Sequence, residues 1–293
     1  MPLEDFICYN GQFIKKKEKI FDSENRAFRY GDGVFETIRV AEKNIFFFKD
    51  HFQRLTSGME ILGFTRNPSF SLEAIADNII KLLNINRLFQ GARIRLSVFR
   101  THGGFYTPES NEFEYVIEVA KLQNKNYILN QKGLIIDIYK EHNKPIGILS
   151  NIKSSNALLY VLASKWKREN NFDDCLLINE NGNIVEATSS NLFIVKDNIL
   201  ITPSLLDGCV DGIIRNHVID IALSLKFVIY DEANVKESDI IEADEIFITN
   251  SINGIQWIVA YKNKRYFNKL SKLFIDKLNK VALINSFQDQ QEH

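Results

Sequence analysis

The sequence is poor in cysteine and carries almost no net charge. Its 293 residues include three cysteines, Cys8, Cys175 and Cys209, which are scattered and odd in number. The chain has no Cys-x-x-Cys pair and no His/Cys cluster, so the sequence indicates no metal site, and buried free thiols in a reducing compartment are the simplest interpretation. A formal net charge of -1 gives no bulk attraction to nucleic acid or to anionic membranes.

Long apolar runs, internal repeats and low-complexity segments are also missing. No hydrophobic stretch approaches the length of a membrane span, and the polar N-terminus, Met1-Pro2-Leu3-Glu4-Asp5, lacks the pattern of a signal peptide. These absences predict a cytoplasmic protein that does not enter a membrane. With 45% hydrophobic and 25% charged residues, the composition suits one large or two modest globular domains.

The polar stretch 123–126 is the predicted interdomain link. It separates a smaller N-terminal domain, residues 1–122, from a larger C-terminal domain, residues 127–293. Periodicity and turn residues predict strands at 6–9, 34–40, 44–48, 93–100, 114–120, 134–139, 191–196, 199–202, 227–230 and 245–249. They predict helices at 50–62, 71–83, 155–169, 211–225, 238–242 and 268–283. Many antiparallel strands with interspersed helices favour an α+β fold.

The segment 151–193 carries the most information about chemistry. It contains Asn151-Ile152-Lys153-Ser154-Ser155-Asn156, an apolar helical run, an Asn-Gly hairpin turn, and then Glu186 followed by Asn191-Leu192-Phe193. It resembles the core signature of the class IV aminotransferases, which use pyridoxal phosphate (PLP). A lysine amine can hold PLP as a Schiff base, and a carboxylate on the pyridinium nitrogen keeps the ring protonated as an electron sink. The resemblance therefore implies catalytic roles for Lys153 and Glu186, although a lone lysine or a strand glutamate ordinarily faces solvent.

Three further segments resemble the phosphate-binding motifs of this family. Asp211-Gly212-Ile213-Ile214-Arg215 opens a helix, where backbone N–H groups form a natural anion site. The resemblance implies that Gly212, Ile213 and Ile214 bind the phosphate, together with Asn250 and Ser251 and with Arg54 of His51-Phe52-Gln53-Arg54-Leu55. The alternatives are a helix capped by Asp211 and a solvated Arg54. For His51 we favour a structural role, orienting a neighbour or capping the helix start.

The substrate-binding residues are expected in two segments. Tyr30-Gly31-Asp32-Gly33-Val34-Phe35-Glu36-Thr37-Ile38-Arg39 is nearly the N-terminal signature of the family, which implies that Tyr30, Phe35 and Arg39 line the substrate pocket. Arg93, Arg95 and Arg100 flank or lie in one strand, and arginines on one face are costly unless anions approach them. The resemblance places the substrate carboxylate there, with Arg100 closest to the D-amino-acid branch, whereas pairing with internal acids is the structural alternative.

The motifs extend over nearly the whole chain and imply fold type IV of the PLP enzymes, two α/β domains with the cofactor between them, assembled as a homodimer. The first functional hypothesis is an aminotransferase that acts on a small amino acid and a 2-oxo acid. A close alternative is a 4-amino-4-deoxychorismate lyase that releases pyruvate, because Arg100-Thr101-His102-Gly103-Gly104-Phe105-Tyr106-Thr107-Pro108 resembles the arginine and glycine loop of those lyases. A distant alternative is a non-catalytic binding protein on the same fold, against which intact Lys153 and Glu186 argue.

Overall fold

The computed structural model describes residues 5–42 and 44–284, which form two compact units. The first unit contains the chain up to Asn126, the short segment Lys153–Asn156 and the described residues from Ala282 onward. The second unit contains Tyr127–Ile152 and Ala157–Val281. The sequence predicts a larger domain over 127–293, whereas the second unit lacks Lys153–Asn156 and the described residues from Ala282 onward, which belong to the first unit.

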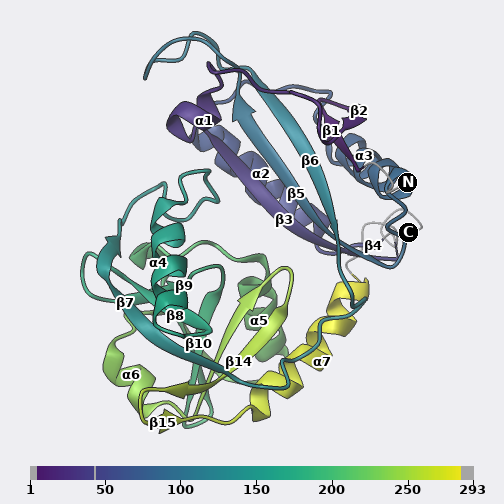
Figure 1. The fold of residues 1–293 in the computed structure, drawn as a ribbon. Helices are drawn as coiled ribbons and strands as arrows, with labels where there is room; N and C mark the ends of the chain where they lie inside the picture. The colour runs from purple at the N-terminus through teal and green to yellow at the C-terminus, as the bar shows by residue number, and fades with distance from the viewer. Residues whose placement is uncertain (1–4, 43, 285–293) are drawn as a thin grey trace. The chain divides into compact units, whose positions relative to one another are not determined.

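The first unit is an antiparallel sheet with helices on one face. The strand order is β2-β1-β6-β5-β3-β4, and helices α2 and α3 cover one face of this sheet (Figure 1). The strands are β1 (Phe6–Tyr9), β2 (Gln12–Lys15), β3 (Gly33–Ala41), β4 (Asn44–Ile45), β5 (Gly91–Arg100) and β6 (Phe113–Lys121). The helices are α1 (Arg26–Tyr30), α2 (Phe48–Ile61) and α3 (Leu72–Ile85). Alternate β3 residues such as Ile38 and Val40 are buried, as expected for a strand with one face against helices.

The boundary between β4 and α2 differs from the sequence prediction. The predicted strand 44–48 ends at Ile45, and α2 begins at Phe48 rather than at Asp50. Phe47 takes a left-handed conformation, φ +53°, at the N-cap, which breaks the alternation. The predicted N-cap of α3 is confirmed, because the Ser71 hydroxyl accepts a hydrogen bond from the N–H of Ala74.

The second unit is built on a nine-stranded sheet in the order β12-β11-β10-β13-β14-β7-β8-β9, with β15 paired to β14. Strand β9 also pairs with β10, so six of the strands close into a ring around an apolar core. The strands are β7 (Leu134–Lys144), β8 (Asp174–Asn179), β9 (Ile184–Ala187), β10 (Asn191–Lys196), β11 (Ile199–Pro203), β12 (Val228–Ala233), β13 (Glu245–Asn250), β14 (Gly254–Tyr261) and β15 (Lys264–Arg265). The helices are α4 (Leu158–Glu169), the short 3-10 helix η1 (Leu205–Asp207), α5 (Ile213–Ser224), α6 (Glu237–Glu242) and α7 (Lys269–Ile284).

The predicted turns of this unit are confirmed. Gly182, in the turn between β8 and β9, has φ +70°, and Asp197 and Asn198 have φ +50° and +63° between the antiparallel strands β10 and β11. Two successive positive φ angles are typical of a two-residue hairpin turn. The helix predicted from 155 begins instead at Leu158, because Ser154 and Ser155 pair with the start of β3. The fold is α+β, as the pattern of elements predicts.

Cys8, Cys175 and Cys209 are all buried free thiols. No helix among the described residues is long and apolar enough to cross a bilayer.

Candidate active site

The backbone around Lys153 is hydrogen-bonded to β3, the strand that contains Gly33 to Arg39 of the N-terminal motif. The carbonyl of Lys153 accepts a hydrogen bond from the N–H of Phe35 at 2.9 Å, and the N–H of Ser155 donates to the carbonyl of Gly33 at 2.8 Å. A Cβ atom on Gly31, which has φ +66°, would lie 2.5 Å from Oδ1 of Asn156, so a side chain at position 31 would displace this segment. The structure therefore places the predicted PLP lysine against β3 of the first unit.

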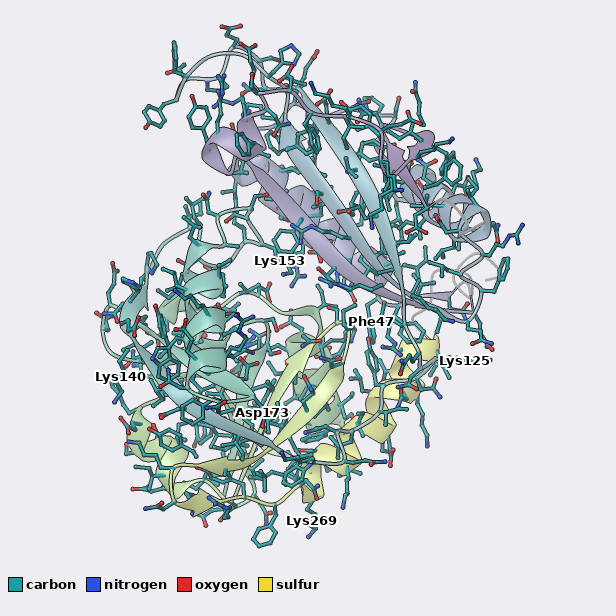
Figure 2. All side chains as sticks on the ribbon, viewed as in Figure 1. Phe47, Lys125, Lys140, Lys153, Asp173 and Lys269 are labelled. Carbon is teal, nitrogen blue, oxygen red and sulfur yellow. The ribbon has the colours of Figure 1, made fainter. Side chains whose placement is uncertain are left out.

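The Lys153 side chain, labelled in Figure 2, lies beside an aromatic ring. Its Nζ atom is 4.1 Å from the ring centroid of Phe35, and Cζ of Arg95 is 3.9 Å from the same centroid. The residue is half-buried. Lys153, Phe35 and Arg95 thus share one face of the sheet, the face opposite α2 and α3.

Glu186 is buried, with hydrogen-bond donors on both carboxylate oxygens. It is 3% exposed, and Oε1 accepts from the Tyr160 hydroxyl at 2.7 Å and from the Lys144 ammonium, while Oε2 accepts from the N–H of Val210 at 2.9 Å. Three donors, one of them a cation, thus hold the two oxygens of this carboxylate. The prediction that this strand glutamate is buried rather than solvated is confirmed.

Lys144 and Tyr160 were not singled out from the sequence. Lys144 is the last residue of β7 and follows a run of charged and polar residues, a pattern that is typical of a solvated strand end. Tyr160 lies in the first turn of α4, where an aromatic residue is most often simple packing. Burial raises the pKa of Tyr160, and Glu186 raises it further, so the phenol stays protonated and donates its hydrogen bond. No local signal in the sequence identifies either residue, since each is defined by its contact with Glu186.

The start of α5 is joined to Glu186 and lacks a side-chain cap. Val210, which donates to Glu186, has its carbonyl held by Nδ2 of Asn191 at 2.7 Å. The N-cap is Gly212 rather than Asp211, and Gly212 has no side chain that could accept a capping bond from the first turn. A Cβ atom on Gly212 would lie 1.8 Å from Oδ1 of Asn191, so only glycine allows this approach. Backbone N–H groups at the start of a helix can bind an anion, so this helix start fits a phosphate.

Thr249 adds an unpartnered hydroxyl beside this helix start. It pairs with Asn191 in the register of β10 and β13, it is 1% exposed, and its Oγ1 has no hydrogen-bond partner within the described residues. By contrast, the amide of Asn250 is engaged, since Nδ2 donates to the Ser190 hydroxyl at 2.9 Å and Oδ1 accepts from backbone N–H groups of the following turn. The family motif implies Asn250 and Ser251 from this segment, whereas no signal in the sequence distinguishes Thr249.

Arg54 is held by a buried acid on the helix-covered side of the first unit. Its Nε and Nη2 atoms donate to the two oxygens of Glu36, both at 2.7 Å, and His51 Nδ1 lies 2.7 Å from Glu36 Oε2. Burial on its own would raise the pKa of Glu36, but the nearby Arg54 and then His51 outweigh it and hold that pKa well below its usual range. Arg54 is 12% exposed, so it is not the solvated helix residue of the alternative interpretation. The expected structural role of His51 agrees with these contacts.

Two of the predicted substrate arginines are committed to contacts within the first unit. Arg39 is 4% exposed and donates to the backbone carbonyls of Asn124, Lys125 and Asn126, with Nε 3.4 Å from the second of these and Nη2 2.9 Å from the third. Arg39 therefore holds the predicted interdomain link. The substrate role of Arg39 stays a prediction, and its partners here are backbone carbonyls rather than the internal acids of the structural alternative.

Arg100 has a similar set of contacts. It is 5% exposed, its Nε donates to Asp32 at 2.9 Å, Nη1 to Asn111 at 2.6 Å and Nη2 to the carbonyl of Leu62 at 2.6 Å. Its Cζ lies 4.6 Å from the ring centroid of Phe64. All three guanidinium nitrogens are engaged, so binding a substrate carboxylate would require one of these contacts to break.

The remaining substrate candidates are more accessible. Arg93 is exposed and Arg95 is half-buried on the same face as Phe35. Burial lowers the pKa of Arg95, an effect that Glu118 partly offsets. Tyr30 is half-buried at the end of α1, 5.4 Å from Tyr106 between ring centroids.

Comparison with known proteins identifies the family. Residues 33–261 match the profile of the family described as amino-transferase class IV, which covers most of the chain. The chain is 30% identical over 254 residues to the aminodeoxychorismate lyase of Bacillus subtilis, covering 84% of this chain and 83% of that protein. It is 26% identical over 252 residues to the D-alanine aminotransferase of Bacillus licheniformis, covering 84% of each. It is 27% identical over 248 residues to the branched-chain-amino-acid aminotransferase-like protein 2 of Arabidopsis thaliana, which covers 83% of this chain but only 43% of that longer protein.

The fold is shared with solved structures of the same family. The branched-chain aminotransferase of the archaeon Thermoproteus uzoniensis superposes with a TM-score of 0.87 at 20% identity, covering 97% of each chain. The protein therefore belongs to the class IV aminotransferases, a family of PLP-dependent enzymes with fold type IV.

Proposed function

We propose that the protein is a PLP-dependent aminotransferase that acts on a small amino acid and a 2-oxo acid. The observation that carries the proposal is Glu186, a buried carboxylate with three hydrogen-bond donors that is joined through Val210 to an uncapped helix start. A solvated strand glutamate would need none of these contacts. The intact Lys153 argues against a non-catalytic binding protein on the same fold.

The residues present fit the cofactor. The primary amine of Lys153 would bind its aldehyde carbon, and Glu186 would accept a hydrogen bond from its protonated ring nitrogen. The first-turn N–H groups of α5, at Gly212, Ile213 and Ile214, would hold the phosphate. Arg54, Asn250 and Ser251 complete the proposed phosphate contacts, to which the unpartnered hydroxyl of Thr249 is added. When bound, PLP supplies a protonated ring that delocalises the electron pair left on the substrate carbon.

The chain's own residues would carry out the proton transfers. Lys153, once released, would move the proton between the substrate Cα and the cofactor C4′. Glu186 would hold the proton on the ring nitrogen throughout, and the donors from Lys144, Tyr160 and Val210 keep that carboxylate oriented. Because the Phe35 ring lies against the Lys153 ammonium, it limits the positions that the amine can take.

For the substrate, we propose that Arg95 binds the carboxylate. It shares its sheet face with Phe35 and Lys153, whereas Arg39 and Arg100 are committed elsewhere, and Tyr30 and Arg93 would line the rim. A guanidinium binds a carboxylate through two parallel hydrogen bonds that lysine cannot copy. Arg95→Lys should therefore raise KM for the carboxylate substrate about tenfold or more and leave the spectrum of bound PLP unchanged. An unchanged KM would contradict this role.

The proposal is tested first at the cofactor. The purified protein should be yellow, and borohydride reduction followed by peptide mapping should fix the cofactor on the peptide that contains Lys153. Labelling of another lysine, such as Lys144, would overturn the assignment. A panel of L- and D-amino acids, each with 2-oxoglutarate or pyruvate as acceptor, then defines the donor.

The alternative is a lyase that releases pyruvate from aminodeoxychorismate. It is supported by the 30% identity to the Bacillus subtilis lyase. It is also supported by the hydrogen bonds that hold the glycine loop after Arg100. The side chain of Arg26, the first residue of α1, holds this loop. It donates to the loop carbonyls of Gly103, Gly104, Phe105 and Tyr106, and it pairs with Asp32 at 2.9 Å. Pyruvate release without an added oxo acid, at a rate above that of any transamination, would favour the lyase.

We also propose that the protein is a cytoplasmic homodimer that binds neither nucleic acid nor membrane. Helix α4 exposes Leu158, Val161 and Leu162, which are 77%, 59% and 44% exposed and lie at helical spacing on one face. An apolar face of this kind is typical of a covered surface, and a second copy of the chain would cover it. Light scattering should give twice the chain mass of 33.9 kDa, and Val161→Asp should shift the protein toward the monomer. A monomeric wild type would contradict the proposal.

A further inference from the structure

A lysine in the second unit lies in direct contact with the carboxylate that we assign to the cofactor ring. Lys144 is 4% exposed and its Nζ forms an ion pair with Oε1 of Glu186. The same ammonium is 5.6 Å from the ring centroid of Tyr160, whose hydroxyl donates to the same oxygen. A buried lysine is rare, and this one ends β7 in the register of Asn179 on β8.

The groups that face Glu186 come from several elements. Lys144 comes from β7, Tyr160 from α4, and Cys209 from the segment before α5. Burial and then Glu186 raise the pKa of the Cys209 thiol to about 12, although Arg215 and Lys144 oppose this shift, so the thiol is neutral at physiological pH. The Tyr160 phenol is neutral as well, because burial and then Glu186 raise its pKa. Of these three groups, Lys144 is the one that carries a positive charge, and this charge compensates Glu186.

A cation in this position has two consequences. It compensates a buried carboxylate that would otherwise be costly, and it places positive charge beside the oxygens that would face the ring nitrogen. It also occupies Oε1 together with Tyr160, whereas Oε2 accepts from a single donor among the described residues, the N–H of Val210 at 2.9 Å. Because a carboxylate oxygen can accept two hydrogen bonds, Oε2 is the oxygen with capacity for the ring N–H.

We propose that Lys144 is a positioning residue that keeps Glu186 ionised and sets how tightly this carboxylate holds the proton on the ring nitrogen of PLP. The proposal rests on the proposed function, in which Glu186 is the partner of that nitrogen. It assigns to Lys144 an electrostatic role distinct from the covalent role of Lys153. Tyr160 supports the same carboxylate oxygen as a neutral donor.

The first test is the thermal stability of the cofactor-free protein as a function of pH. In Lys144→Met the unpaired carboxyl should take up a proton in the folded state more readily than in the unfolded state, so stability should fall as pH rises. The melting temperature of Lys144→Met should therefore lie below that of the wild type at about pH 8, and the difference should shrink toward about pH 5. Lys144→Arg should restore the wild-type profile. A difference that is constant with pH would overturn the electrostatic role.

A matched control is available on the same strand. Lys140, labelled in Figure 2, also forms an ion pair, with Glu237 at 2.9 Å, but its side chain is 59% exposed. Lys140→Met should follow the wild-type pH profile. In a Glu186→Gln background, Lys144→Met should no longer destabilise the protein at high pH, because Lys144 is then itself the buried charge without a partner. Persistence of the effect in that background would contradict the pairing.

The second test reads the ring nitrogen of the holoenzyme. With ¹⁵N-labelled PLP, the ring-nitrogen resonance should titrate about one to three pH units higher in Lys144→Met than in the wild type, because removal of the cation makes Glu186 a stronger proton acceptor. An unchanged titration would overturn the proposal. If the wild type instead fails to bind PLP at Lys153, the proposed function fails, while the pH profile of the cofactor-free protein still decides whether Lys144 compensates Glu186.

Discussion

Replacement of Arg100 by lysine should reduce thermal stability and leave substrate binding nearly unchanged. The guanidinium donates to Asp32, Asn111 and the carbonyl of Leu62, and it stacks near Phe64. A lysine ammonium cannot span the three acceptors from one position, because its donors radiate from a single nitrogen. We expect the variant to keep the contact with Asp32 and to lose the other two.

The magnitude follows from these contacts. Each lost hydrogen bond to a charged group costs about 1.5 kcal/mol, and the Arg100 end of both bonds is buried, so the two together cost about 3 kcal/mol. For a domain of roughly this size, each kcal/mol lowers the melting temperature by about 2–4 °C, which gives a decrease of about 6–12 °C. This decrease exceeds what a solvated pair would give.

The assay is thermal unfolding of the holoenzyme beside steady-state kinetics. Arg66→Lys is the matched control, since Arg66 forms a 2.6 Å ion pair with Glu60 while its side chain is 88% exposed. An exposed pair contributes about 0–1 kcal/mol, so the control should melt close to the wild type. A melting temperature for Arg100→Lys equal to that of the control, together with a raised KM for the carboxylate substrate, would refute the structural interpretation and favour the substrate role that the sequence suggests.

Three other variants test the remaining roles. Glu186→Gln should retain PLP but lose most of its turnover, because a neutral amide does not hold the ring proton, and a near-wild-type kcat would place that role elsewhere. Arg54→Ala combined with Glu36→Gln, which avoids leaving the Glu36 charge unpaired, should raise the Kd for PLP about ten- to a hundredfold. An unchanged titration would show that Arg54 only compensates Glu36. His51→Gln should make the loss of stability on acidification below about pH 6.5 shallower than in the wild type. Burial lowers the pKa of His51 despite the opposing effect of Glu36, so the stability that its neutral form contributes is present above about pH 6.5 and lost as pH falls. Parallel acid profiles of the two proteins would contradict this assignment.

The pH argument for His51 has a structural basis. Its Nδ1 contacts Glu36, whereas Nε2 is buried without a partner among the described residues. A proton added at Nε2 would be a buried N–H without an acceptor, which is costly. The neutral ring with its proton on Nδ1 is therefore the form that the fold accommodates.

Caps and turns, which are formed by residues close together in the sequence, could be predicted from the sequence alone. The Ser71 cap, the Asn181-Gly182 hairpin and the turn at Asp197 and Asn198 depend on residues within a few positions of one another, and all are present. The boundary at Phe47 was missed because three successive buried phenylalanines have no clear period, and the left-handed conformation of Phe47 depends on packing that the sequence does not display.

The order of motifs likewise selected Lys153 and Glu186, because each lies in a short segment with a recognisable pattern. Tertiary structure alone decided what surrounds them. Lys144 meets Glu186 across 42 positions, and Arg39 meets the carbonyl of Asn124 across 85. A charged residue at a strand end is solvated or buried according to which distant strands and helices cover it, and a guanidinium serves a substrate or the backbone according to which carbonyls the fold brings within reach. Local sequence patterns carry no information about such long-range contacts, so the partners of the arginines and of Glu186 emerged only from the folded chain.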